Sequence, residues 1–120
     1  MITVGGIRPQ KDPHAFAQIA AACPFPHVHF TWVGDGDEAA KKALCDAGVN
    51  VTGWCARAEV LAQVSRADIY LSTALWEGLP VALIEAQSVG AILLVNNCPG
   101  NTDVVTHGES GYVFSTVSQA

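Results

Sequence analysis

The residues best suited to bind a ligand are two glutamates, Glu77 and Glu85, which flank the segment Gly-Leu-Pro-Val-Ala-Leu-Ile. Glu77 follows an apolar run at 69–72, and Glu85 lies within a helix predicted over 80–89. Carboxylates accept hydrogen bonds from hydroxyl groups, and the first turn of a helix presents free amides and partial positive charge to an anion. This segment therefore predicts a site for a ligand that carries hydroxyl and anionic groups.

Glu85 needs a hydrogen-bond partner if its helix is buried. It shares a helical stripe with Val81 and Val89, and the helix is apolar on nearly every side, which predicts burial. A buried carboxylate without a partner is very costly. The sequence is compatible with two kinds of hydrogen-bond partner: a ligand hydroxyl in a crevice, or a backbone loop that the carboxylate holds in place. Trp76, beside Glu77, is expected in the core.

A second candidate is Gly34-Asp35-Gly36, between an expected strand at 28–33 and an expected helix at 38–47. Glycines let backbone amides approach a phosphate closely, but Gly-Asp-Gly is also a common turn, and both interpretations stay open. Asp35 and Asp37 would repel a phosphate. We therefore expect one of them to cap the following helix.

These residues require a frame of alternating strands and helices. The expected strands lie at 2–4, 28–33, 49–53, 69–72, 92–96 and 112–114, with helices or helical turns between them. Strands that are continuous apolar runs predict a parallel sheet covered on both faces. We expect an α/β fold with a doubly wound, Rossmann-like sheet, in which ligands bind beyond the carboxyl ends of the strands. The candidate residues fall in loops at that edge.

The amino-acid composition limits the classes of partner that the chain could bind. The 120 residues are 50% hydrophobic and 14% charged, with a net charge of −5, which indicates one globular domain and argues against nucleic acid or an anionic membrane surface. No signal peptide or membrane-spanning run is visible, so we expect a cytoplasmic protein. The four scattered cysteines predict reduced, mostly buried thiols. No metal-ligand spacing occurs, and no metal site is expected.

The segment from Glu77 to Glu85 resembles the E-x7-E motif of the group 1 glycosyltransferases (family GT4), which have the GT-B fold. Other segments resemble the same family in the same order, at 2–11, 32–36, 52–54, 67–71, 97–101 and 108–112. The resemblance therefore extends over essentially the whole chain. The resemblance implies a single domain at 1–120, the C-terminal, nucleotide-sugar-binding domain of a GT-B enzyme. The N-terminal acceptor domain and the C-terminal helical tail of the family would then be absent.

The resemblance also implies roles for individual residues. Glu77 and Lys11 would be catalytic: Glu77 near the reacting carbon of the sugar, Lys11 on the diphosphate and its departing charge. Glu85 would hold the ribose hydroxyls. The remaining nucleotide-sugar-binding positions would be Gly34, Gly36, Gly78, Leu79, Pro80 and Val81 around the phosphates, and Trp54 near the base.

One position departs from the family pattern. The family usually has an arginine five residues before the loop lysine, but this chain has Gly6 there and Arg8 two positions later. Either Arg8 turns back toward the phosphates, or Lys11 binds them alone. Gly6 and Arg8 are therefore both counted among the expected nucleotide-sugar-binding residues.

The function implied by the resemblance is the donor-binding half of a retaining glycosyltransferase of the hexosyltransferase type, in polysaccharide biosynthesis. It would use a nucleotide-diphosphate sugar without cofactor or metal, and would reach a glycan or lipid-linked acceptor only with its N-terminal domain. The full-length enzyme could be peripheral at the membrane. A non-catalytic nucleotide-binding module, or one subunit of a split glycosyltransferase, stays open as an alternative. A flavodoxin-like receiver is disfavoured because its acidic cluster is missing.

Overall fold

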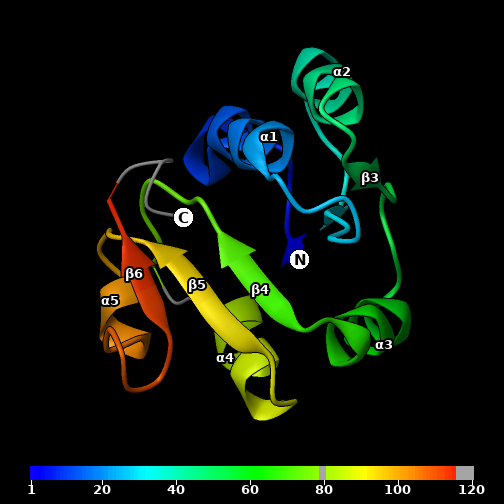
Figure 1. Ribbon diagram of the computed structural model, residues 1–120. Helices are drawn as coiled ribbons and strands as arrows, with labels where there is room; N and C mark the ends of the chain where they lie inside the picture. Colours follow the sequence, from blue (N-terminus) through cyan, green and yellow to red (C-terminus); the bar gives the residue numbers. More distant parts are fainter. Residues whose placement is uncertain (79–80, 116–120) are drawn as a thin grey trace.

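In the computed structural model, which describes residues 1–78 and 81–115, six parallel strands form one sheet (Figure 1). The strands are β1 (Ile2–Val4), β2 (Thr31–Val33), β3 (Asn50–Val51), β4 (Ile69–Ser72), β5 (Ile92–Asn96) and β6 (Tyr112–Phe114). Their order is β3-β2-β1-β4-β5-β6, which is the order of doubly wound Rossmann sheets. The predicted fold class is confirmed.

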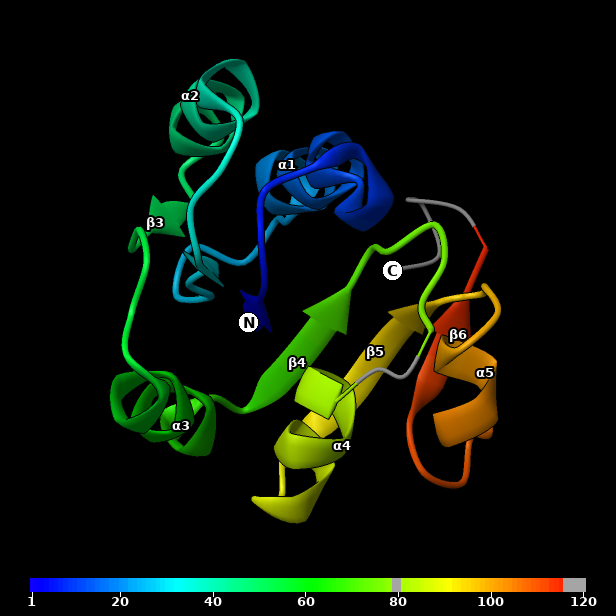
Figure 2. The ribbon, with the colours of Figure 1, turned by 180° about the vertical axis from the view of Figure 1, so that it is seen from behind.

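Helices cover both faces of the sheet. They are the 3-10 turn η1 (Pro9–Lys11) and the helices α1 (Pro13–Ala22), α2 (Glu38–Asp46), α3 (Arg57–Arg66), α4 (Val81–Ser88) and α5 (Asn101–Val104). α4 lies behind β4 and β5 in Figure 1 and in front of them in Figure 2, so it covers the face opposite α1. Aspartates cap two of these helices. Asp12 accepts from the Ala15 amide at the start of α1, and Asp37, one of the two expected candidates, accepts from the Ala40 amide at the start of α2.

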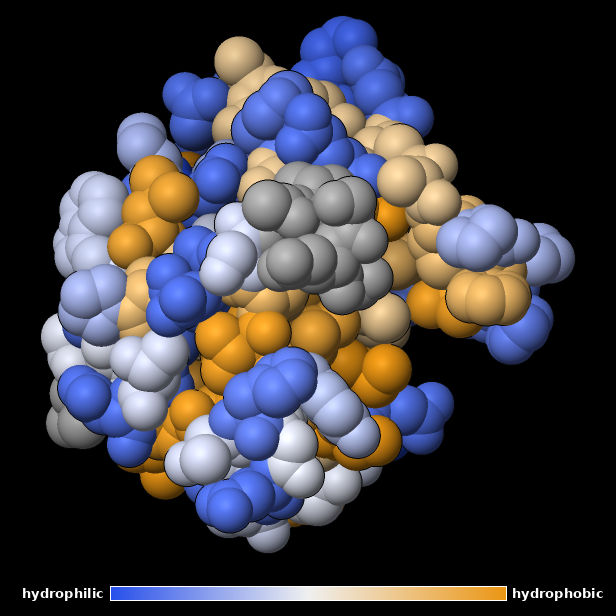
Figure 3. Space-filling model, turned by 60° about the vertical axis from the view of Figure 1, so that its left-hand side comes forward, coloured by the Kyte–Doolittle hydropathy of each residue, from blue (hydrophilic) through white to orange (hydrophobic). Residues whose placement is uncertain are grey.

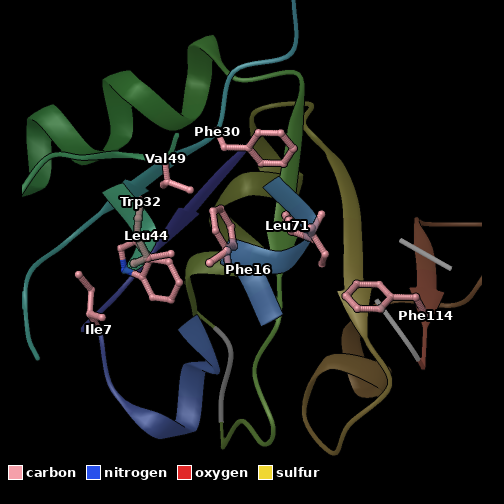
Figure 4. Close-up of a cluster of buried hydrophobic side chains, with 10 residues drawn as sticks. Ile7, Phe16, Phe30, Trp32, Leu44, Val49, Leu71 and Phe114 are labelled. Atoms are coloured by element: carbon pink, nitrogen blue, oxygen red, sulfur yellow. The ribbon is translucent and has the colours of Figure 1, made fainter. Parts of the chain in front are cut away.

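Two hydrophobic cores result, one on each face, because the strands alternate their side chains between the two. In β4, Leu71 points into the core under α1 and α2, and Tyr70 into the core under α3 and α4. Phe16 of α1 lies at the centre of the first core, with its ring 5.1 Å from that of Trp32 and 6.2 Å from that of Phe30 (Figure 4).

The chain order reverses between β1 and β4, and this switch point positions the site. β1 pairs with β2 on one side and with β4 on the other. The chain runs from β1 out to β3 and then returns to β4. The loops after β1 and β4 therefore leave the same edge of the sheet side by side, where ligands bind in such folds.

Several expectations on element length and burial were wrong. β2 begins at Thr31 instead of residue 28, because the Val28 amide donates to the Phe25 carbonyl in a turn. Helix α4 is not buried all round: Leu83 and Ala86 face the core, but Val81, Ile84 and Val89 are 49%, 42% and 43% exposed. A helix on the outer layer of a sheet buries one face only.

Surface residues gave further corrections. Trp76 was expected in the core but is 54% exposed. The cysteines form no disulfide, as expected, yet Cys45 is exposed and only Cys98 is fully buried. Figure 3 shows a face where hydrophobic residues gather in the middle among hydrophilic ones. Within the described residues, every helix is too short or too polar to cross a membrane.

Candidate functional site

The centre of the site is an ion pair between Lys11 and Glu77 at the switch point. Lys11 Nζ lies 2.5 Å from Glu77 Oε1, and the two side chains are 20% and 11% exposed. Lys11 ends the turn after β1 and Glu77 lies in the loop after β4. The structure therefore brings together the two residues that the family resemblance marks as catalytic.

Hydrogen bonds hold the two loops against each other. The Thr73 hydroxyl donates to the carbonyls of Lys11 and Asp12 at 2.7 and 3.0 Å. The Leu75 amide donates to the Gln10 carbonyl at 2.8 Å, and the Gln10 side chain donates to the Trp76 carbonyl at 2.9 Å. Lys11 and Glu77 are thus held in place by their backbones as well as by their charges.

The Arg8 side chain lies against Gly6, the position at which the family usually has an arginine. A Cβ atom built on Gly6 would lie 3.2 Å from Arg8 Nε and 3.3 Å from Arg8 Cζ, so the guanidinium lies over the Gly6 backbone. The Lys11 side chain lies in the same way over Gly5, with Cε 3.1 Å from the corresponding position. Two consecutive glycines therefore make room for the two cationic side chains, one over each glycine.

Gly34 and Gly36 serve a close approach of two loops. A Cβ atom on Gly34 would lie 2.0 Å from the Gly5 carbonyl oxygen, and one on Gly36 would lie 2.3 Å from that of Ile7. The Gly36 amide, expected to face phosphate, donates instead to Asp35 Oδ1 at 2.9 Å. These glycines pack the loop after β2 against residues 5–7, which carry the cationic turn.

Glu85 has a protein partner that sequence reasoning missed. Arg57, at the start of α3, donates from Nη2 to Glu85 Oε1 at 2.7 Å. Glu85 is 23% exposed and Arg57 is 73% exposed, so the pair lies at the surface of the α3–α4 junction. One carboxylate oxygen is thereby fixed, and the pair leaves Oε2 available to a ligand. Arg57 is the first residue of α3, and no local pattern in the sequence pointed to its pairing with Glu85.

The remaining predicted residues lie apart from this centre or outside the described residues. Trp54 is 81% exposed in the loop between β3 and α3. Gly78 is exposed, and Val81 begins the described part of α4 with half of its side chain exposed. Leu79 and Pro80 fall outside the described residues. Within residues 1–78 and 81–115, no cluster of histidine, cysteine or carboxylate side chains could hold a metal ion.

A small polar cavity lies beneath the Lys11–Glu77 pair. Its volume is about 90 Å³, and its walls include the first turn of α4, the side chains of Thr3 and Ser72, and Asn101. Burial raises the pKa of the adjoining Tyr70 hydroxyl, and the negative charges of Glu77 and Glu85 raise it further. Tyr70 is therefore neutral at physiological pH and bridges to Val4 by hydrogen bonds.

The arrangement can bind an anion and a set of hydroxyls at once. Lys11 and the first turn of α4 line one cavity and can attract an anion, and Arg8 precedes the turn that Lys11 ends. Glu77 and Glu85 supply hydrogen-bond acceptors. A lysine ammonium has three donors, and the bond to Glu77 uses one of them. The geometry suits a compact ligand with a charged centre and polyhydroxylated ends.

Comparisons with known proteins place the chain in a family. Its sequence matches glycosyl transferases group 1 over residues 1–120. It is 32% identical over 127 residues to the Escherichia coli UDP-Gal:alpha-D-GlcNAc-diphosphoundecaprenol alpha-1,3-galactosyltransferase, covering 92% of this chain and 31% of that protein. The lipopolysaccharide outer core galactosyltransferase WaaB in its apo form has a similar fold, with a TM-score of 0.84 and 21% identity over 98% of this chain and 36% of the other.

A second solved structure, Anabaena HepE in complex with UDP and glucose, gives a TM-score of 0.80 with 20% identity, over 96% of this chain and 34% of the other. The chain therefore spans about a third of the length of the proteins it matches. Its order of segments, its sheet and its whole-length match to the family agree. This chain belongs to the group 1 glycosyltransferases.

Proposed function

We propose that this chain binds the nucleotide-diphosphate-sugar donor of a retaining glycosyltransferase, as the second domain of a GT-B enzyme. The observation that carries the proposal is the meeting of Lys11 and Glu77 at 2.5 Å beside the first turn of α4, at the switch point of the sheet. A cation and a helix N-terminus at one point suit a diphosphate, and a mostly buried carboxylate next to them suits a sugar hydroxyl.

In this proposal Lys11 and Arg8 bind the diphosphate and stabilise the charge that develops as the sugar leaves. Because Glu77 already holds Lys11, the phosphates compete with a carboxylate for the ammonium group. Glu85, fixed through Oε1 by Arg57, accepts from the ribose hydroxyls through its other oxygen. Lysine, arginine and helix amides supply the positive charge, so the reaction as proposed requires no metal. UDP, which occupies the related HepE structure, is the first nucleotide to test.

The proposal leads to a calorimetric test of donor binding. Wild type should bind UDP more tightly than uridine or inorganic phosphate. Glu85→Ala should weaken binding of both UDP and uridine by about 1.5–3 kcal/mol, because a charged acceptor for the ribose is lost. Glu109→Ala, which removes an exposed carboxylate from the loop between α5 and β6, is the matched control. Unchanged affinity in a folded Glu85→Ala protein would remove the ribose assignment.

We further propose that transfer to a glycan or lipid-linked acceptor needs protein beyond these 120 residues. Catalysis of group transfer depends on holding both reactants together and excluding water, and the site described here offers one wall. The purified chain should therefore transfer no sugar above background in a radiolabelled-donor assay, while it retains UDP binding. Robust transfer by the purified chain alone would contradict this architecture.

A further inference from the structure

The cavity beneath the Lys11–Glu77 pair contains an unsatisfied buried acceptor. Asn101 is 1% exposed, and its Oδ1 has no hydrogen-bond partner among the described residues. Buried side-chain acceptors are nearly always paired in native proteins, so an unpaired one requires an explanation. Asn101 lines the same cavity as Lys11 and Glu77.

The orientation of the Asn101 amide is fixed by its neighbours. Nδ2 donates to the Asn96 carbonyl at 3.2 Å and to Ser72 Oγ at 3.3 Å. A backbone carbonyl can only accept, so the NH2 group must face Asn96 and the oxygen must be the atom left without a partner. Asn101 thus offers an acceptor whose direction is set by the protein.

The polar groups that line the cavity indicate which chemical group would pair with this acceptor. The unpaired atom is an acceptor near the Glu77 carboxylate, which excludes a phosphate oxygen as its partner. The volume of about 90 Å³ holds a few water molecules or one small polar group. The first turn of α4 (Val81, Ala82 and Leu83) also lines the cavity, and backbone amides in the first turn of a helix have no partner within the helix. A hydroxyl group suits this lining, because it can donate to Asn101 Oδ1 and accept from an amide.

We infer that Asn101 is a specificity-determining residue that accepts a hydrogen bond from one hydroxyl of the transferred sugar. The inference rests on the proposed function, since Glu77 at the mouth of the cavity is the residue proposed to contact that sugar. Glu85 and Arg57, the residues proposed at the ribose, do not line this cavity. Asn101 therefore discriminates among sugars and leaves the affinity for the nucleotide unchanged.

A thermodynamic cycle tests this inference. The probes are UDP, UDP-galactose and the monodeoxy analogues of UDP-galactose, each titrated calorimetrically into wild type and Asn101→Leu. In wild type, loss of one particular hydroxyl should weaken binding about five- to tenfold, the range for a hydrogen bond to a neutral group. In Asn101→Leu the loss of the same hydroxyl should change affinity less than twofold, and UDP affinity should stay within twofold of wild type.

The matched control is Asn97→Leu, which changes an exposed asparagine in the loop that leads to α5. If Asn101→Leu does not fold, the deoxy series on wild type is itself decisive: no hydroxyl worth fivefold overturns the inference. Equal losses for UDP and UDP-galactose in Asn101→Leu would show a structural role and also overturn it. Wild type that binds neither UDP nor UDP-galactose would instead overturn the proposed function. If wild type binds both UDP and UDP-galactose, but loss of each sugar hydroxyl costs the same affinity in wild type and in Asn101→Leu, only this inference is overturned.

Discussion

Lys11 and Glu77 neutralise each other within the candidate site. Each charge satisfies the other at 2.5 Å, so neither is left unpaired in a mostly buried position. In the proposed function, a diphosphate would offer Lys11 a doubly charged alternative to one carboxylate oxygen. Glu77 would then be released toward the sugar, where an acceptor is needed.

Arg8 is the residue on which the two interpretations of the phosphate-binding loop differ. Its guanidinium lies over Gly6, which supports the version in which Arg8 replaces the missing arginine. Arg8→Ala should weaken UDP binding about tenfold and change uridine binding less than twofold, because a charge-assisted bond to phosphate is lost. Gly6→Arg should add little, since Arg8 already occupies the space.

The same titrations can also show that Arg8 does not bind phosphate. A gain in UDP affinity from Gly6→Arg, with no loss from Arg8→Ala, would mean that Lys11 binds the phosphates alone. If neither substitution alters the preference for diphosphate over nucleoside, no basic group of this loop binds phosphate, and a non-catalytic module becomes the better description.

At the scale of elements, the glycine loop after β2 supports the cationic turn. Gly34→Ala should lower the free energy of unfolding by about 1–3 kcal/mol more than Gly48→Ala, as measured by urea denaturation. Both glycines have positive φ, so both substitutions introduce backbone strain. Only Gly34 would also place its Cβ against the Gly5 carbonyl, whereas Gly48 has no atom within 4 Å. Equal destabilisation by the two substitutions would refute the close-approach role.

The elements were predictable from sequence because apolar runs, helix caps and glycines act locally. The caps at Asp12 and Asp37 depend on residues three positions away, and the structure has both. Burial was harder to predict, since it depends on neighbours distant in sequence. Nothing in the sequence indicated that Val81, Ile84 and Val89 face outward. Apolar residues occur on nearly every side of α4, so no polar face marked the side exposed to solvent.

The site was predicted only in part, because some of its contacts join residues that are distant in the sequence. Lys11 and Glu77 were named from the resemblance, and their contact follows from the strand order. The pairing of Arg57 with Glu85 could not be predicted, because 28 residues separate them and no local pattern joins α3 to α4. Nor could the Asn101 acceptor, since its lack of a partner arises from packing around a cavity.

At the scale of the whole molecule, the fold places all charged parts of the site on one edge. The loops after β1 and β4 supply Lys11 and Glu77 because these adjacent strands flank the switch point. Relatives about three times as long contain further protein that this chain does not match. In the proposed two-domain enzyme, this edge of the sheet would form one wall of the donor site.

The most direct test of this account is a crystal structure of the chain with UDP bound. The account predicts the diphosphate at the switch point, with its oxygens within roughly 3.2 Å of Lys11 Nζ and the Arg8 guanidinium, and the ribose hydroxyls on Glu85. UDP bound at another face of the sheet, or phosphates remote from Lys11 while the Lys11–Glu77 pair stays closed, would contradict it.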